Sequence, residues 1–153
     1  MNYWLFKSEP DAFGIDDLKA LPGKRDHWDG IRNYQARNFM RDMKKGDLGF
    51  FYHSSCPDPG IVGVVEIVKE AYPDHTAWDP DSNYHDPKST PESPRWDMVD
   101  VKYRRKFKSV LSLSSLREVP ELEEMTLLRK GNRLSIMPIS KAEWEVITAL
   151  AEG

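Results

Sequence analysis

The segment HWDGIRNYQARNFM, residues 27–40, places an indole, a carboxylate, amides and guanidinium groups close together. Trp28 precedes Asp29-Gly30, which is typical of a turn, and the residues after Ile31 have helical character. A ring presented at the start of a helix can stack on a nucleobase while polar neighbours hydrogen-bond to the edge of the base. Burial in the core is the alternative, since most large aromatic side chains are structural.

A second chemically active pattern is the alternating segment RWDMVDVKYRRKFKSV, residues 95–110. Its apolar side chains are expected on one face of a strand and are Val99, Val101, Tyr103 and Phe107. The basic side chains on the other face, called here the basic stripe, are Lys102, Arg104, Lys106 and Lys108. Alternate strand residues lie ~6.6 Å apart, so the stripe could follow the phosphates of a nucleic acid. A solvated face that protects an edge strand from aggregation is the alternative.

The sequence gives weaker evidence for metal binding and for nucleophilic catalysis. His75 and His85 lie in an Asp-rich loop, but no pair of residues there has the spacing of a preformed zinc site. Cys56 follows His53 by three residues, yet it precedes a proline in a turn and no orienting motif accompanies it. The sequence therefore predicts no metal, no cofactor and no catalytic nucleophile.

The bulk properties favour one globular domain over residues 1–153, in which 39% of the residues are apolar and 31% are charged. A net charge of −3 argues against binding to nucleic acid through bulk charge alone. No apolar run is long enough to cross a bilayer, and the N-terminal residues do not resemble a signal peptide. The single Cys56 is typical of a reducing compartment, so we expect a cytoplasmic protein.

Hydrophobic periodicity predicts the elements that position these groups. Strands are expected at 2–7, 48–54, 61–72, about 95–110 and 133–139, and helices at 13–21, 32–43, 112–119 and 140–152. The strand at 61–72 is apolar on both faces, which indicates burial on both sides. Residues 73–94 contain five prolines and are expected to pack over the domain as an extended loop. The elements together predict a mixed, mainly antiparallel β-barrel with short helices, an α+β fold.

Several segments, in this order, resemble the EVE domain family of the PUA-like superfamily, to which YTH and ASCH domains are related. They are YWLFKSEP, WDGIRNYQARNFMR, GDLGFFYHS followed by PGIVGVVEIVKEAYPD, and MVDV. The resemblance covers nearly the whole chain and implies a PUA-like barrel. It also implies binding of a modified base, carbon-5-modified cytosine or similar, flipped out of DNA or RNA into an aromatic pocket. Nuclear members carry a basic N-terminal extension that this chain lacks, so a bacterial-type cytoplasmic location is expected.

The resemblance assigns residues to the pocket. Trp28 would be the stacking surface, and Asp29 and Asn33 would contact the edge of the base. The other residues expected around the base are Lys7, Ser8, Phe51, His53, Ser54, Pro59, Gly60, Ile61, Met98, Val99 and Asp100. Arg32 and Arg37 are expected to join the basic stripe in contacting phosphates. Trp78 and Trp96 are candidates for a second aromatic wall.

Two other functions stay open at this point. An enzyme acting on a modified nucleobase or RNA would need a general base, for which only Asp29, His53 and Asp100 are suitably placed. A small-molecule or nucleoside sensor could use the same pocket. The expected partner is nucleic acid that carries a modified base, with no membrane contact and a monomeric or weakly dimeric protein.

Overall fold

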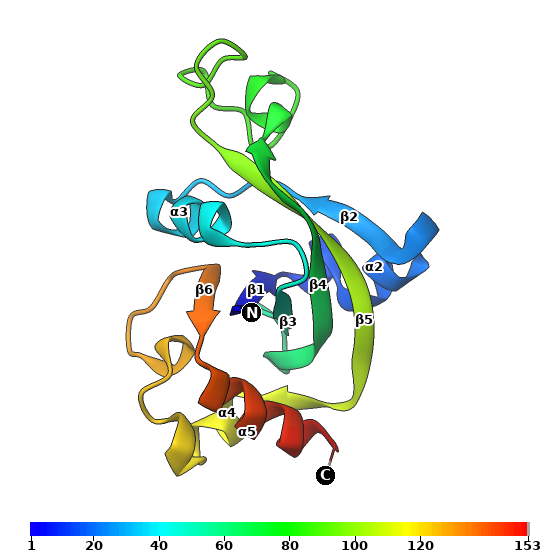
Figure 1. The fold of residues 1–153 in the computed structure, drawn as a ribbon, viewed down its shortest axis with the longest axis vertical. Coiled ribbons are helices and arrows are strands. Elements are labelled where there is room, and N and C mark those ends of the chain that lie inside the picture. The colour runs from blue at the N-terminus through cyan, green and yellow to red at the C-terminus, as the bar shows by residue number, and fades with distance from the viewer. Residues whose placement is uncertain (153) are drawn as a thin grey trace.

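The computed structural model describes residues 1–152 and contains six strands with short flanking helices (Figure 1). The strands are β1 (Tyr3–Ser8), β2 (Arg25–Trp28), β3 (Leu48–His53), β4 (Gly60–Pro73), β5 (Asp97–Ser112) and β6 (Ile136–Ile139). The α-helices are α1 (Pro10–Phe13), α2 (Ile15–Ala20), α3 (Tyr34–Asp42), α4 (Leu113–Arg117) and α5 (Lys141–Glu152). The 3-10 turns are η1 (Pro22–Lys24), η2 (His75–Trp78), η3 (Pro120–Leu122) and η4 (Thr126–Leu128).

All six strands form one sheet in the order β2-β5-β4-β3-β1-β6. Only β1 and β3 pair in parallel, and the other neighbours are antiparallel. The α+β class and the mainly antiparallel pairing are confirmed. Within residues 1–152 no pairing joins β6 to β2, so the sheet is open and the expected closed barrel is not confirmed.

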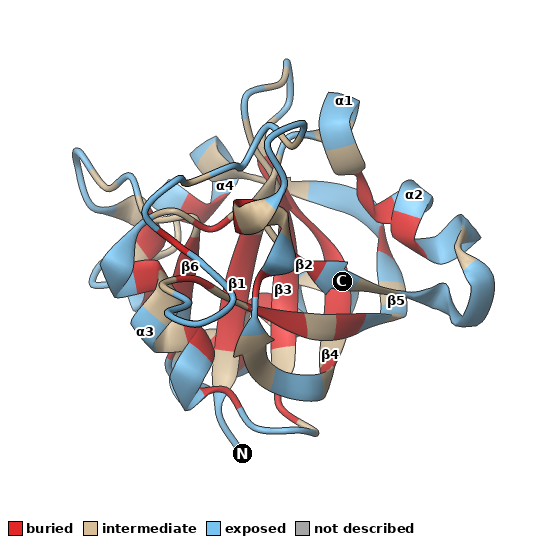
Figure 2. Cartoon of the chain, turned by 90° about the horizontal axis from the view of Figure 1, so that it is seen from above, coloured by how far each residue is buried: buried red, intermediate tan, exposed pale blue. Residues whose placement is uncertain are grey.

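The sheet is buried on both faces by two hydrophobic clusters, which appear as red segments along the strands in Figure 2. The first cluster contains Trp4, Phe6 and Phe51, and the second contains Leu5, Phe50 and Tyr52. Successive residues of β1 and β3 alternate between the clusters because side chains alternate across a strand. β4 also contributes to both clusters, which confirms the expected two-sided burial.

Irregular pairing between β4 and β5 changes which face a residue of β5 occupies. Val99 and Val101 pack in the first cluster, whereas Phe107 packs in the second. The register of the two strands shifts between Val64 and Val65, and such an irregularity inserts an extra residue and reverses the alternation. The prediction that Phe107 shares a face with Val99 and Val101 is therefore wrong.

Trp28 lies at the end of a strand rather than at the start of a helix. The short strand β2 pairs with β5, with Trp28 opposite Val99. Five residues separate Trp28 from Tyr34, where α3 begins, and Asn33 is the N-cap of that helix. A strand of four residues has no detectable alternation, so the sequence pattern did not predict β2.

The segment 73–96 begins at the last residue of β4 and extends beyond the ends of β4 and β5, at the top of Figure 1. The segment contains η2 and is anchored at its base, where Asp74 N–H donates to Trp96 O over 2.8 Å. It contacts the region around α3 instead of lying across the sheet. The expectation of a loop packed over the barrel is corrected in that respect.

Candidate functional site

A cavity of about 620 Å³ opens at the carboxyl ends of the parallel strands β1 and β3. Its lining comes from β1, α1, β2, the turn after β2, the end of β3 and the segment 73–96. The lining residues used below are Lys7, Ser8, Phe13, His27, Trp28, Asp29, Gly30, Ser54, Tyr84 and Arg133. The volume suits a small ligand such as a nucleoside, because such pockets measure roughly 300–1,000 Å³.

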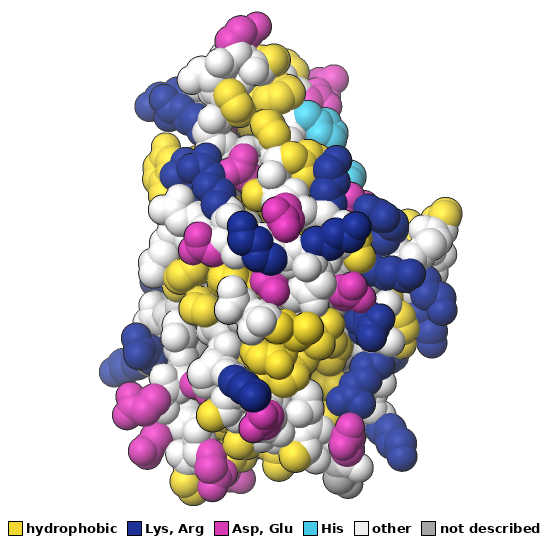
Figure 3. All heavy atoms as spheres, in the orientation of Figure 1, with side chains coloured by type: hydrophobic (Ala, Val, Ile, Leu, Met, Phe, Trp, Pro, Cys, Tyr) yellow, Lys and Arg dark blue, Asp and Glu magenta, His cyan; other side chains and the backbone are white. Residues whose placement is uncertain are grey.

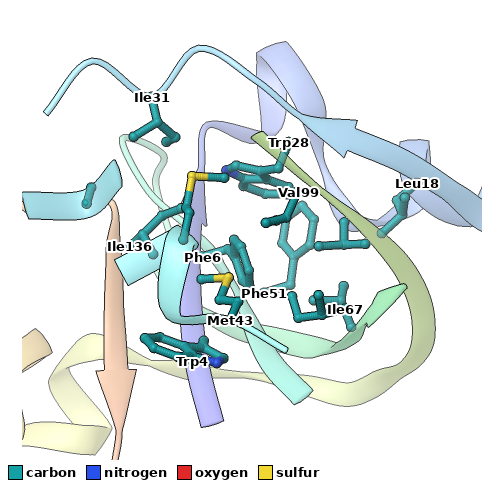
Figure 4. Close-up of a cluster of buried hydrophobic side chains, with 14 of the residues drawn as sticks. Trp4, Phe6, Leu18, Trp28, Ile31, Met43, Phe51, Ile67, Val99 and Ile136 are labelled. Atoms are coloured by element: carbon teal, nitrogen blue, oxygen red, sulfur yellow. The ribbon is translucent and has the colours of Figure 1, made fainter. Parts of the chain in front are cut away.

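Trp28 is mainly a core residue whose remaining surface lines this cavity. Only 7% of it is exposed, and its ring packs edge-on against Phe6 at 5.1 Å, Phe51 at 5.4 Å and Phe13 at 6.2 Å between centroids. Figure 4 shows the indole above Phe6 within this aromatic group. Aromatic pairs prefer such edge-to-face geometry, so the ring is rigidly held. Trp28 is therefore a core residue that also lines the cavity, and its stacking on a base stays a prediction.

Carboxylates beside Trp28 give the cavity an acceptor-rich side. His27 lies between two of them, with Nδ1 3.3 Å from Asp26 and Nε2 3.4 Å from Asp29. Burial raises the pKa of Asp29, an effect that His27 partly offsets and Asp74 reinforces. At neutral pH an ionised Asp29 can accept a hydrogen bond from an amino group in the cavity.

Tyr84 forms the outer aromatic wall of the cavity, on the side of the segment 73–96. The ring lies against Gly30, where an added Cβ would be 2.7 Å from a ring carbon and the φ of +78° also favours glycine. The structure therefore brings Tyr84 to the place where a second wall was expected. Trp96 is buried instead, and Trp78 is not among the lining residues.

A hydrogen-bonded cluster around the buried carboxylate of Asp74 holds the backbone of Tyr84, and we call Arg32, Asp74, Thr76 and Tyr84 the Arg32 cluster. Arg32 donates to Tyr84 O from Nε over 2.9 Å and from Nη2 over 2.6 Å, and its Nη1 lies 3.1 Å from Asp74. Asp74 also accepts hydrogen bonds from the N–H groups of Gly30 and Thr76, both over 2.9 Å. The side chain of Asp74 is fully buried and that of Arg32 is 23% exposed, so water reaches the ion pair only from the side of Arg32.

The structure places part of the sequence-predicted pocket around this cavity. The predicted residues that line it are Lys7, Ser8, Trp28, Asp29 and Ser54. Asn33 instead caps α3, where its Oδ1 accepts from the N–H of Ala36 over 2.9 Å. His53 accepts from the N–H of Ile15, and burial lowers its pKa. Phe51 packs behind Trp28, in the core.

The remaining predicted residues lie on β4 and β5 or just before β4, outside the lining. Gly60 and Ile61 pair with the end of β5, and Pro59 precedes them. Asp100 accepts hydrogen bonds from Arg25 and Tyr72, while Met98 and Val99 are buried. Sequence reasoning missed Phe13, Tyr84 and Arg133 as lining residues. The sequence distinguishes these residues only by their aromatic or basic type, which many other positions share.

Within residues 1–152 no three His, Cys, Asp or Glu side chains gather as a metal site would require. Over the same range, no helix has the length and apolar character needed to cross a membrane.

The residues predicted to contact phosphates differ in whether a carboxylate already pairs with their charge. Arg104 pairs with Glu66 over 3.1 Å and Lys106 with Asp16 over 3.0 Å, whereas no ion pair within residues 1–152 involves Lys102 or Lys108. Figure 3 shows basic side chains along the side of the molecule where β5 runs. None of the stripe residues lines the cavity. Phosphate binding by the stripe therefore stays a prediction.

We expect the double substitution Lys102→Gln, Lys108→Gln to weaken binding to modified and unmodified oligonucleotides alike. Loss of two phosphate contacts should flatten the logarithmic dependence of affinity on salt by roughly one to two units of slope. Fluorescence anisotropy over a salt series measures this. The matched control is Lys44→Gln, Lys45→Gln, two exposed lysines that precede β3 at the end opposite the cavity. An unchanged slope would leave the stripe as a solvated face.

The fold and the site define an α+β domain with a partly aromatic, polar-sided pocket at the end of two parallel strands. A family model described as the EVE domain matches residues 2–150, and the chain belongs to the EVE domain family.

Relatives in that family resemble the chain over its whole length. It is 45% identical to mouse thymocyte nuclear protein 1 and 42% identical to the human protein, covering 99% of this chain and 74% of each relative. The structure of human THYN1 in complex with DNA that contains 5-methylcytosine superimposes with a TM-score of 0.96 at 42% identity, covering 100% of this chain and 99% of that one. A structure from Pseudomonas syringae gives 0.94 at 55% identity, covering 97% and 99%.

Proposed function

We propose that this domain binds nucleic acid that contains a carbon-5-modified cytosine, with the modified base flipped into the cavity beside Trp28. The observation that carries the proposal is the likeness, over the full chain, to the human THYN1 structure solved in complex with DNA containing 5-methylcytosine. The cavity supports it, because its volume of about 620 Å³ accommodates a base together with its sugar.

In this proposal the base lies between the exposed part of Trp28 and the ring of Tyr84, and Asp29 contacts its edge. Cytosine carries an exocyclic amino group that donates hydrogen bonds, which a carboxylate accepts well. Asp29 is half-buried, so a bond made there competes less with water than one on the surface. Lys7 and Ser54 also line the cavity and can donate to the remaining polar atoms, whereas the hydroxyl of Ser8 already donates to Phe13 O over 2.6 Å and can only accept.

The methyl group itself contributes little binding free energy. Burying one methyl group stabilises a complex by about 0.8 kcal/mol, which corresponds to roughly a fourfold difference in affinity. A preference larger than about fourfold would require a pocket that fits closely around carbon 5. In such a pocket, water could not fill the space of the missing methyl group when the base is unmodified. The preference between matched oligonucleotides consequently tests how closely the pocket surrounds carbon 5.

The test compares two oligonucleotides that differ in one 5-methyl group. We expect the parent protein to bind the methylated one more tightly, and Asp29→Ala to weaken that binding about tenfold or more, because a lost hydrogen bond leaves a buried donor unpaired, at ~1–3 kcal/mol. The control is Lys44→Gln, at the far end of β3. Equal affinity of the parent protein for both oligonucleotides would contradict the proposal.

The same carboxylate gives a pH prediction. Burial raises the pKa of Asp29, so the carboxylate becomes protonated at a higher pH than an exposed aspartate. Protonation removes the acceptor, and binding of the methylated oligonucleotide should therefore weaken as the pH falls through that raised pKa. The Asp29→Asn variant should lack this dependence. Parallel pH profiles of the two proteins, measured by anisotropy, check the expectation, and identical profiles would assign the dependence to another group.

We also propose two assignments that the fold and family support less directly. The open six-stranded sheet is interpreted as a PUA-like barrel whose edge strands, β2 and β6, do not pair. The single Cys56 is consistent with a cytoplasmic protein. Fractionation of cells that express the protein tests the second assignment.

A further inference from the structure

Aromatic rings and guanidinium groups follow one another from the mouth of the cavity to the start of α3. We call Tyr84, Arg32, Trp96, Tyr34 and Arg37 the ladder. The Cζ of Arg32 lies 5.9 Å from the ring centroid of Tyr84 and 5.7 Å from that of Trp96. Trp96 in turn stacks on Tyr34 at 4.7 Å with 26° between the planes, and the Cζ of Arg37 lies 4.7 Å from the Tyr34 ring.

The two tyrosines of the ladder are exposed although its centre is buried. Trp96 is 5% exposed, whereas Tyr34 is 52% and Tyr84 is 43% exposed. Trp96 and the Arg32 cluster anchor the segment 73–96 to the domain, and Tyr34 adds to this by stacking on Trp96 while half of its surface stays exposed. Exposed aromatic rings are ordinary when they stand singly, whereas rings gathered on one surface with basic side chains indicate a site of interaction.

One face of the Tyr34 ring is open to solvent. The centroid of Trp96 lies 4.7 Å from Tyr34, and the Cζ of Arg37 lies 4.7 Å from Tyr34 and 5.9 Å from Trp96. The 5.9 Å between Trp96 and Arg37 is much shorter than about twice 4.7 Å, the separation of groups directly opposite across the ring, so the two do not lie on opposite faces. The face away from Trp96 is consequently available for stacking.

Arg37 adds a positive charge that no carboxylate neutralises. Its Nε and Nη2 donate to the side chain of Asn38, and its Nη1 donates to the backbone oxygen of Arg95 over 2.9 Å. These acceptors are neutral, and within residues 1–152 no ion pair involves Arg37 or Arg95. A guanidinium group has five N–H donors, so Arg37 keeps donors free for a phosphate.

We propose that the ladder is a second binding surface, on which the nucleic-acid strand beside the flipped base stacks a base on Tyr34 and places a phosphate at Arg37. The inference rests on the proposed function and extends it from one base to the flanking strand. Two features support a nucleic-acid strand as the ligand of this surface. Tyr84 belongs both to the cavity and to the ladder, so the surfaces are continuous, and aromatic rings beside cations match the bases and phosphates of a strand. Basic and hydrophobic side chains lie together over α3 and the segment above it in Figure 3.

The experiment compares a single nucleoside with a strand. Free 5-methyl-2′-deoxycytidine fills only the cavity, whereas an oligonucleotide with one 5-methylcytosine and several flanking nucleotides reaches the ladder. We expect Tyr34→Ala to weaken oligonucleotide binding about tenfold and to leave nucleoside binding as in the parent protein, because stacking contributes ~1–3 kcal/mol per base. Arg37→Gln should lower the salt slope of oligonucleotide binding by about one unit.

Two further variants control for structure. Tyr34→Phe keeps the ring and should bind as the parent does, and Leu150→Ala changes an exposed apolar residue on α5, at the other end of the molecule in Figure 1. If Tyr34→Ala loosens the fold, the test uses the parent protein instead and follows the NMR signals of the Tyr34 ring. These signals should shift with the oligonucleotide and not with the nucleoside.

The outcomes separate this inference from the proposed function. An oligonucleotide affinity that Tyr34→Ala leaves unchanged, or ring signals that do not shift, would overturn the ladder even where the parent prefers the methylated base. Equal loss of nucleoside and oligonucleotide binding would overturn it too. A parent protein that binds both oligonucleotides equally, but loses affinity on Tyr34→Ala, would support the ladder and contradict the modified-base proposal.

Discussion

Trp28→Ala is expected to destabilise the domain by about 3–5 kcal/mol, the usual cost of removing a large buried aromatic ring. The side chain is 7% exposed and has three aromatic neighbours, Phe6, Phe13 and Phe51, whose contacts would all be lost. The cavity left behind would lie directly below the proposed binding site. Urea denaturation monitored by circular dichroism measures the change, which should appear as a lower midpoint.

Trp28→Phe separates stability from binding at this position. It keeps an aromatic ring in the cluster and should cost less stability than the alanine variant, while presenting a smaller stacking surface to a base. We therefore expect a folded protein with weaker affinity for the methylated oligonucleotide. A Trp28→Ala protein with the midpoint of the parent would contradict the core role, and unchanged affinity in a folded Trp28 variant would contradict its contact with the base.

Asp74→Ala is expected to have an effect of similar size, about 3–5 kcal/mol of stability, because it leaves the charge of Arg32 without its buried partner. The same carboxylate accepts from the N–H groups of Gly30 and Thr76, which would be left unpaired. Since the Arg32 cluster holds Tyr84 over the cavity, oligonucleotide affinity should fall as well. Denaturation and anisotropy on the same protein measure the two losses.

The control for Asp74 is an exposed ion pair. Asp16 pairs with Lys106 over 3.0 Å, with side chains 73% and 45% exposed, and Asp16→Ala should change stability by about 1 kcal/mol or less. Should Asp74→Ala unfold at the urea midpoint of the parent, the Arg32 cluster would contribute nothing to stability.

The stability of the domain at low pH should also depend on the carboxylate of Asp74. Burial on its own would raise the pKa of Asp74, but hydrogen bonds from Thr76, Gly30 and Arg32 outweigh it and hold the pKa below its ordinary value. A carboxyl with a depressed pKa stabilises the folded state above its unfolded pKa, and this stabilisation is lost as the pH falls through the folded pKa. The stability of the parent should therefore fall more steeply below about pH 4 than that of Asp74→Asn.

Local patterns in the sequence predict most of the fold because they repeat along an element. The β-forming residues of β1 and β3 and the two-sided apolar character of β4 correctly predict strands and burial. β2 has four residues and no pattern, so Trp28 was expected at a helix. The face that Phe107 occupies depends on a shift in the pairing of β4 with β5, which local sequence does not encode.

The candidate site is less predictable because it joins segments distant in the sequence. Trp28 and Asp29 were recognisable from their types and their turn, and Lys7 and Ser8 from the family resemblance. The ring of Tyr84 reaches the cavity against Gly30, and its backbone oxygen is held by Arg32, which lies 52 residues earlier. Asn33 has the residue type of a base contact, but the same type is favoured at a helix N-cap, and the structure uses it there.

The place of β1 in the sheet has a consequence for the nascent protein. Leu5 pairs with Phe50 on one side and with Met137 on the other, so the earliest strand gains its second neighbour only after nearly all of the domain has been synthesised. Pairings between such distant residues form slowly. The cavity lies at the carboxyl end of β1, where Lys7 N–H donates to Ser135 O over 2.8 Å. A chain still on the ribosome therefore lacks this side of the cavity until the segment leading into β6 has emerged.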